Sequence, residues 1–155
     1  MSINERQYEQ LLKPLNPVRV AKRQQAGRNL SYLEAWDVKA HLIRIFGFGN
    51  WSWNVTSADL AFEDQNEKGH WQVGYKVIGT LCIAQLPCSY TEAAVGSSTQ
   101  PMRGEAHDMA IKTAESDALK RAAINLGTQF GLSLYDNGSL NDVVKATLDQ
   151  EAASE

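Results

Sequence analysis

The chain has 155 residues, of which 43% are apolar, which is enough for one well-packed domain but too little for two. Its first residues lack the apolar stretch of a signal peptide, and no run reaches the roughly 18 apolar residues of a membrane span. We therefore expect a soluble, cytoplasmic protein without a membrane partner. Cys82 and Cys88 lack the paired spacing of a metal site, so we expect reduced thiols in or beside a strand.

The net charge of −3 conceals a segregation of charge along the sequence. Residues 1–44 hold eight Lys and Arg residues against four Asp and Glu residues, whereas residues 136–155 hold one against five. Arg19, Lys22, Arg23 and Arg28 therefore form either a patch that attracts a polyanion or the solvated charges of a flexible N-terminal segment. Charge alone favours neither interpretation.

The first predicted element is a helix that ends at a glycine. The tetrapeptide Ser31-Tyr32-Leu33-Glu34 has the pattern of a capping box, in which the Ser31 hydroxyl and the Glu34 carboxylate cap the first helical turn. The helix then runs through Trp36 to Phe46, and Gly47 supplies the stop.

Three strands are predicted next. Residues 51–56 alternate as a strand does, residues 65–69 have turn chemistry, and residues 73–83 alternate as one long strand that Pro87 ends. A third strand is predicted over residues 89–95, followed by a loop over residues 96–101.

The last predicted element is a long helix over residues 105–126. Its small and apolar side chains recur at helical spacing and form a thin stripe suited to packing on a sheet: Ile111, Ala114, Ala118, Leu119, Ala122 and Leu126. Lys120 projects almost opposite this stripe, and Arg121 lies on its flank. Asp117 precedes the two cations by three and four residues, so an ordinary surface ion pair explains all three residues without a function. The order helix, three strands, helix predicts an α+β fold with a long helix on an antiparallel three-stranded sheet.

Several short motifs together resemble the Rad52/22 family of single-strand annealing proteins. They are Tyr32-Leu33-Glu34, the run Phe46-Gly47-Phe48-Gly49-Asn50-Trp51, the strand entry Gly69-His70-Trp71-Gln72-Val73-Gly74, the run Asp117-Ala118-Leu119-Lys120-Arg121-Ala122, and the trailing Gly127 and Gly131. The resemblance covers about residues 18–135. It implies a β-β-β-α core that assembles into a closed homo-oligomeric ring, with single-stranded DNA in a basic groove around the outside.

The resemblance also implies which residues contact DNA. Lys120 and Arg121 match the pair that grips the DNA backbone in the inner groove, together with either Lys22 or Arg23. His70 and Arg103 lie near the positions of an outer DNA site. Lys112 is a further candidate, for which DNA contact and a plain surface role are close to equal.

Two positions depart from the family pattern. Ile124 replaces a further cation, and His70 stands where the family has Lys, so the grip on DNA is expected to be weaker or differently arranged.

The implied organisation is an annealing domain over residues 1–135 and a short acidic tail over residues 136–155. Because the chain ends at Glu155, we expect a compact annealing core of the kind a phage or bacterium encodes, without the extension with which eukaryotic members engage a recombinase. The implied activity is annealing of complementary strands in recombination and double-strand break repair. A single-strand-binding protein or an exonuclease would be its partner.

The sequence indicates a binding protein instead of an enzyme. It has no phosphate-binding loop of the ATPase type, and annealing is downhill once strands meet, so no cofactor is expected. His41, His70 and His107 are isolated from one another in the sequence, which argues against a metal site. Since annealing requires exposed base edges, we assign Trp51, Trp53 and Trp71 to packing in preference to base stacking.

Two other functions remain open at this point. A double-stranded RNA-binding module has the same order of elements, but it usually has basic residues at the start of its last helix, where this chain has Glu105 and Asp108. A recombination-associated nuclease is the less favoured alternative, because the chain lacks the Glu-x-Lys pattern that metal-dependent nucleases commonly place on a strand.

Overall fold

A computed structural model describes residues 2–148 of the chain. The residues form two compact units. Within the described part of the chain, one comprises residues 2–50, 84–86 and 123–148, and the other comprises residues 51–83 and 87–122. We call them the helical unit and the sheet unit.

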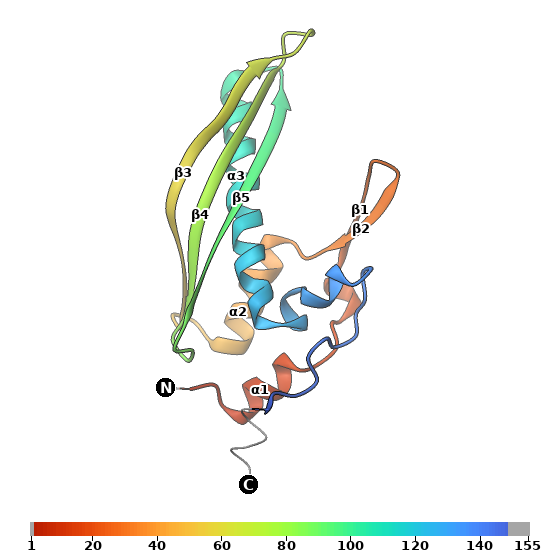
Figure 1. The fold of residues 1–155 in the computed structure, drawn as a ribbon, viewed down its shortest axis with the longest axis vertical. Helices are drawn as coiled ribbons and strands as arrows, with labels where there is room; N and C mark the ends of the chain where they lie inside the picture. Colours follow the sequence, from red (N-terminus) through yellow and green to blue (C-terminus); the bar gives the residue numbers. More distant parts are fainter. Residues whose placement is uncertain (1, 149–155) are drawn as a thin grey trace. The chain divides into compact units, whose positions relative to one another are not determined.

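The sheet unit is the predicted three-stranded sheet with a long helix on one face (Figure 1). The strands β3 (Trp51–Gln65), β4 (Trp71–Ile83) and β5 (Ser89–Gln100) pair antiparallel in the order β3-β4-β5. The helix α3 spans Arg103–Ala123. The predicted α+β class is therefore confirmed, and so is the turn between β3 and β4, where the Asn66 side chain accepts the backbone N–H groups of Lys68 and His70 at 3.0 Å.

Small residues seat α3 closely on the sheet. Ala106 and Ala110 pack with Val73 of β4, and Ala114 and Ala118 pack with Val77 of the same strand. On β5, a Cβ added to Gly96 would lie 2.3 Å from the backbone nitrogen of Ala114. The backbones of β5 and α3 therefore approach as only glycine permits, which confirms the predicted packing stripe.

The predicted loop over residues 96–101 is wrong. Strand β5 continues to Gln100, which pairs with Trp71 at the far end of β4. The glycine that suggested a loop is instead the point of closest approach to the helix. Strand β3 is likewise longer than predicted, and it follows β4 past two register shifts, at Val55/Ser57 and Leu60/Phe62.

The predicted capping box at residues 31–34 is also wrong. Ser31 lies in strand β2 (Arg28–Tyr32), where it pairs with Lys22 of β1 (Ala21–Gln25). Helix α2 begins later, at Ala35, with Glu34 as its N-cap and without a side-chain capping bond. It ends at Phe46 as predicted, because Gly47 adopts a φ of 94° and donates its N–H to Ile43.

The N-terminal elements of the helical unit were not predicted. Helix α1 (Glu5–Leu11) begins with a capping box between Asn4 and Gln7, and a 3₁₀ turn follows over Pro17–Arg19. Strands β1 and β2 then form a hairpin whose two-residue turn, Ala26 and Gly27, has φ values of 51° and 76°. Positive φ at both positions is the geometry of the tight turns that suit a twisted hairpin.

The chain after α3 forms three 3₁₀ turns, over Ile124–Leu126, Thr128–Phe130 and Leu132–Tyr135. The predicted long helix is therefore one turn too long at this end. Phe130 stacks on Phe46 of α2 with ring centroids 6.4 Å apart, which gives the helical unit an aromatic core.

The described part of the acidic tail, residues 136–148, returns to the N-terminal segment. The Leu140 carbonyl accepts the Leu15 N–H at 2.8 Å, and the Tyr8 hydroxyl accepts the Thr147 N–H at 3.0 Å. The rest of the predicted tail lies outside the described residues. No helix within residues 2–148 is long and apolar enough to cross a membrane.

Candidate nucleic-acid interface

Lys120 and Arg121 lie in the last turn of α3. The Lys120 ammonium is 3.3 Å from the Asp117 carboxylate, and 29% of the Lys120 side chain is exposed. Arg121 is more open, at 53%, and its guanidinium is 3.5 Å from Glu92 of β5. The predicted pairing with Asp117 is therefore confirmed for Lys120 and wrong for Arg121, which lies one helical position further round and faces β5.

Both ion pairs are weak. They lie at the surface, where water screens the charges, and such pairs contribute between zero and about 1 kcal/mol. The carboxylates of Asp117 and Glu92 lie 3.3 and 3.5 Å from the two cations. A phosphate can therefore replace either carboxylate at little cost, while the alanine-packed helix keeps the two cations in place.

Lys22 and Arg23 occupy strand β1 of the hairpin, and both are exposed. Successive strand residues face opposite sides, so the two cations point away from each other. The Arg23 guanidinium lies over the ring of Tyr32, 5.2 Å from its centroid, on the face that Lys22 does not share. Arg28 is exposed across the ladder from Gln25, so this hairpin of the helical unit is a basic ribbon.

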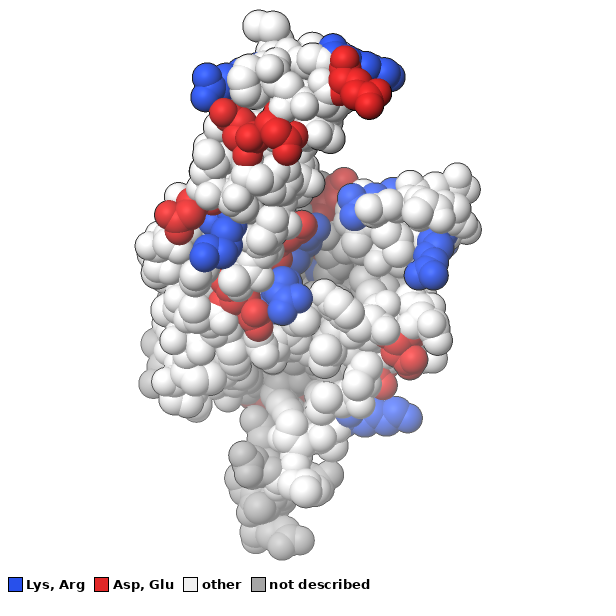
Figure 2. All heavy atoms as spheres, turned by 45° about the horizontal axis from the view of Figure 1, so that its top comes forward, with Lys and Arg blue, Asp and Glu red and all other residues white. Residues whose placement is uncertain are grey.

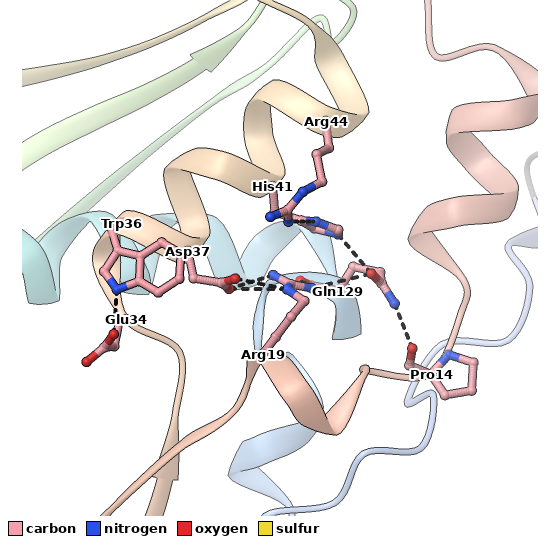
Figure 3. A network of polar contacts seen from close by, with 8 residues as sticks. All are labelled: Pro14, Arg19, Glu34, Trp36, Asp37, His41, Arg44 and Gln129. Carbon is pink, nitrogen blue, oxygen red and sulfur yellow. Dashed lines mark hydrogen bonds and ion pairs between the residues drawn. The ribbon is translucent and has the colours of Figure 1, made fainter.

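Arg19 does not belong to that ribbon. Its side chain is 11% exposed and makes a bidentate contact with the buried Asp37 carboxylate of α2, the shorter distance being 2.9 Å (Figure 3). It also donates to the Gln129 carbonyl at 2.8 Å. The interpretation of Arg19 as a solvated charge of a flexible segment is therefore wrong.

His41 completes this polar network. Arg44 can only donate, so the His41 Nδ1 at 3.0 Å accepts and its Nε2 donates to the Gln129 side-chain oxygen at 2.8 Å (Figure 3). This arrangement requires a neutral ring. Burial, and then the positive charge of Arg19, lower the pKa of His41 to about 4. The network therefore holds the N-terminal segment to α2 and to the Thr128–Phe130 turn, which is a structural role.

Arg103 lies in the first turn of α3, and its guanidinium is already occupied. Glu63 of β3 accepts from two of its nitrogens, at 2.9 and 3.1 Å, and the Trp71 ring lies beneath it at 4.9 Å. Arg103 and Lys120 are about 25 Å apart along the helix at roughly 1.5 Å per residue. The sheet unit therefore carries two separate cationic positions, and it does not bring Arg103 to the Lys120–Arg121 pair.

The remaining candidates are less distinctive. Lys112 pairs with Asp108 at 2.8 Å, and both side chains are largely exposed, as is typical of an i,i+4 surface pair. His70 is half-buried at the end of the β3–β4 turn, where its backbone N–H is held by Asn66. Ile124, which replaces a family cation, is half-buried in the 3₁₀ turn after α3.

Two tryptophans pack as predicted. Trp53 joins the cluster around Val77, and its ring nitrogen donates to Glu115 at 2.9 Å, while Trp71 packs on the cluster around Val73. Trp36 was missed as a surface feature: it is 66% exposed, and its ring nitrogen donates to Glu34 at 2.5 Å. The sequence pattern placed Trp36 in a helix without assigning it to the surface, since no local signal marked it as exposed.

Acidic and basic side chains lie side by side at several places on the face drawn in Figure 2. In the sheet unit, the candidate cations Arg103, Lys112, Lys120 and Arg121 each have a carboxylate close by, so they do not form a continuous positive surface. Cys82 and Cys88 are both free thiols, the second of them exposed. Among residues 2–148, no group of three or more His, Cys, Asp and Glu side chains is placed to hold a metal ion.

Comparison with known proteins gives a consistent result. Residues 4–153 match the family described as "Rad52/22 family double-strand break repair protein". The DNA repair and recombination protein rad22 of Schizosaccharomyces pombe is 34% identical over 87% of this chain, and RAD52 of Saccharomyces cerevisiae is 31% identical over 88%. The protein rti1 of S. pombe is 28% identical over 84% of the chain.

The chain spans only 29% of the length of the first and second of these relatives and 36% of the third. All three come from fungi, so they give no support to the phage or bacterial setting that we expected. The match nevertheless runs through nearly the whole sequence, from α1 into the acidic tail. The chain belongs to the Rad52/22 family.

Proposed function

We propose that this chain binds single-stranded DNA and anneals complementary strands during recombination and double-strand break repair, without ATP and without catalysing a chemical step. Membership of the Rad52/22 family supports this function, as do the names of the relatives, which are DNA repair and recombination proteins. The single observation that carries it is the Lys120–Arg121 pair, which the alanine-packed helix α3 holds at the surface beside carboxylates at 3.3 and 3.5 Å.

The chemistry suits annealing. Lys and Arg contact phosphates and leave the base edges free to pair with a second strand. The packed positions of Trp53 and Trp71 are consistent with a surface that does not bind DNA by stacking its bases. The exposed hairpin cations Lys22 and Arg23 would add phosphate contacts, with Arg23 oriented by Tyr32. Arg103 and Lys112 are further proposed contacts.

Assembly into a ring is part of the proposal, because one Lys–Arg pair contributes few phosphate contacts and a ring repeats the pair in every subunit. Strands β3 and β5 are the two edges of the sheet, and each has an unpaired side that could pair with a neighbouring subunit. A single-strand-binding protein or an exonuclease would supply or expose the DNA.

The test is an annealing assay with the purified protein and two complementary oligonucleotides. Lys120→Ala and Arg121→Ala should each slow annealing and weaken binding to single-stranded DNA several-fold, with the melting temperature almost unchanged. Lys145→Ala removes an exposed cation from the tail and serves as the matched control. Equal annealing by all three variants would contradict the proposal, and tighter binding to duplex RNA than to single-stranded DNA would favour the RNA-binding alternative.

A further inference from the structure

Arg103 is held in a way that distinguishes it from the other candidate cations. Glu63 accepts from the Nε and Nη2 of Arg103 at 3.1 and 2.9 Å, and the guanidinium rests on the Trp71 ring. The Arg103 side chain is nevertheless 62% exposed, whereas the Glu63 side chain is 18% exposed. The carboxylate is thus a well-placed part of the sheet unit, and the arginine is accessible from solvent.

Glu63 is fixed by a second donor. The Tyr75 hydroxyl is 2.6 Å from the Nδ1 of His107, and the His107 Nε2 contacts the Glu63 carboxylate. A carboxylate can only accept, so the His107 Nε2 donates to Glu63, and in the neutral ring the Nδ1 accepts from the Tyr75 hydroxyl. The hydrogen bond from His107 and then the one from Arg103 lower the pKa of Glu63, so the carboxylate is charged at neutral pH. Residues from β3, β4 and α3 together hold this negative charge against Arg103.

A carboxylate and a phosphate bind a guanidinium through the same pair of parallel hydrogen bonds. Glu63 therefore occupies the position that a DNA phosphate would take on Arg103. If a phosphate displaces it, Glu63 keeps its hydrogen bond from His107, so the exchange leaves no buried charge without a partner.

We propose that Glu63 is a built-in competitor of DNA phosphate at Arg103, which makes this contact conditional on displacement of the carboxylate. The inference rests on the proposed function and adds regulation at one of its contacts. Arg103 differs in this respect from Arg121, whose carboxylate partner makes a single contact at 3.5 Å. The carboxylate partners therefore predict an order in which the cations bind DNA. Lys120 and Arg121 bind first, and Arg103 binds only when a phosphate displaces Glu63.

The test measures binding of a fluorescent oligothymidylate to the full chain as a function of salt. Glu63→Gln removes the charge but keeps an acceptor for His107. It should bind about two- to fivefold more tightly, as expected for loss of an exposed ion pair that competes with the ligand. The salt dependence should steepen by about 0.7 in the slope for each Arg103 that gains a phosphate.

Three further variants separate the proposal from a general effect of charge. Glu63→Asp keeps the negative charge but moves it away from Arg103 by the length of one methylene group, so this variant should also bind the oligothymidylate more tightly. Asp64→Asn removes a charge from the next residue of β3, which faces the opposite side of the sheet, and should change affinity much less. In an Arg103→Ala background, Glu63→Gln should have no effect.

Equal effects of Glu63→Gln and Asp64→Asn would overturn the inference, and so would a Glu63→Gln effect that persists without Arg103. A purely structural Glu63 would give a lower melting temperature and weaker binding, which is opposite in sign to the expected gain in affinity. If Lys120→Ala and Arg121→Ala weaken binding while Glu63→Gln leaves it unchanged, this inference fails and the proposed function stands. If neither cation variant affects binding, the proposed function itself fails.

Discussion

The helical unit and the sheet unit each contain an arginine paired with a carboxylate, and the two pairs differ in almost every physical respect. Arg19 and Asp37 are 11% and 4% exposed and meet at 2.9 Å, whereas Arg121 and Glu92 are 53% and 32% exposed and meet at 3.5 Å. The first pair has further hydrogen bonds to Gln129. The second consists of one long contact at the surface.

This difference shows how the same two side-chain types form a fixed structural contact in one place and an exchangeable surface contact in another. A buried pair is fixed because either partner alone would leave an uncompensated charge in a medium of low dielectric constant. An exposed pair is exchangeable because water screens it and a phosphate offers the same hydrogen bonds. Burial, more than residue type, decides which of these arginines can exchange its carboxylate partner for the phosphate of the proposed DNA ligand.

The largest expected effect comes from breaking the buried pair. Asp37→Asn should lower the free energy of unfolding by about 3–5 kcal/mol, because it leaves the Arg19 charge buried without a counter-charge. Glu92→Gln breaks the exposed pair and should change the free energy of unfolding by less than about 1 kcal/mol. Urea denaturation of both variants measures the difference, and similar losses would show that burial does not separate the two pairs.

A second prediction concerns the rigidity of the helix that carries Lys120 and Arg121. Gly96→Ala should destabilise the protein by about 1–3 kcal/mol, because its Cβ would overlap the backbone of α3 near Ala114. Gly104→Ala, in the first turn of the same helix with nothing within 4 Å of the added Cβ, is the control and should be neutral or stabilising. Thermal denaturation of the two variants measures this difference. An unchanged melting temperature of Gly96→Ala would contradict the close approach of β5 and α3.

A smaller effect on the free energy of unfolding is expected from pH, through His41 in the buried network. Unfolded His41 titrates near 6.5, whereas burial and Arg19 lower its pKa in the folded protein to about 4. Between these two pH values the unfolded chain binds more protons than the folded protein. The contribution of neutral His41 to the free energy of unfolding is therefore fully present above pH 6.5 and is lost as the pH falls toward 4. We expect the free energy of unfolding to fall by about 1–2 kcal/mol, a value that allows for the partial exposure of the His41 side chain.

Denaturation at pH 7.5 and pH 5 measures this effect, with His41→Gln as the control that removes the titrating group. The wild-type protein should lose more stability between the two pH values than the variant does. Equal losses would show that His41 does not contribute.

The sequence was sufficient to predict the sheet unit because its signals are periodic and local. Alternation along β4 placed Val73 and Val77 on the buried face, and the alanine spacing of α3 predicted its packing side. The same local signals misled at Gly96, because a glycine in a loop and a glycine at a close backbone approach have identical sequence signatures. The predicted capping box at Ser31 was wrong for a related reason, because Ser31 pairs with strand β1 instead of capping the helix.

The candidate site was predictable in part. Lys120 and its partner Asp117 follow from helical spacing, but Glu92 and Glu63 are distant in sequence from the arginines that they contact. The network around Arg19 was likewise unreadable, since it joins residues 19, 37, 41 and 129 through tertiary structure. Long-range polar contacts therefore define both the structural and the exchangeable arginines, and a single sequence carries no signal for them.

The central claim is that Lys120 and Arg121 are exchangeable cations that bind phosphate. Its most direct test is the salt dependence of oligothymidylate binding by the Lys120→Ala/Arg121→Ala double variant, with the melting temperature measured in parallel. The account predicts weaker binding, a salt slope reduced by about 0.7 for each phosphate contact that is lost, and an almost unchanged melting temperature. An unchanged slope, or a large loss of stability with normal affinity, would show that the pair is structural and would contradict the account.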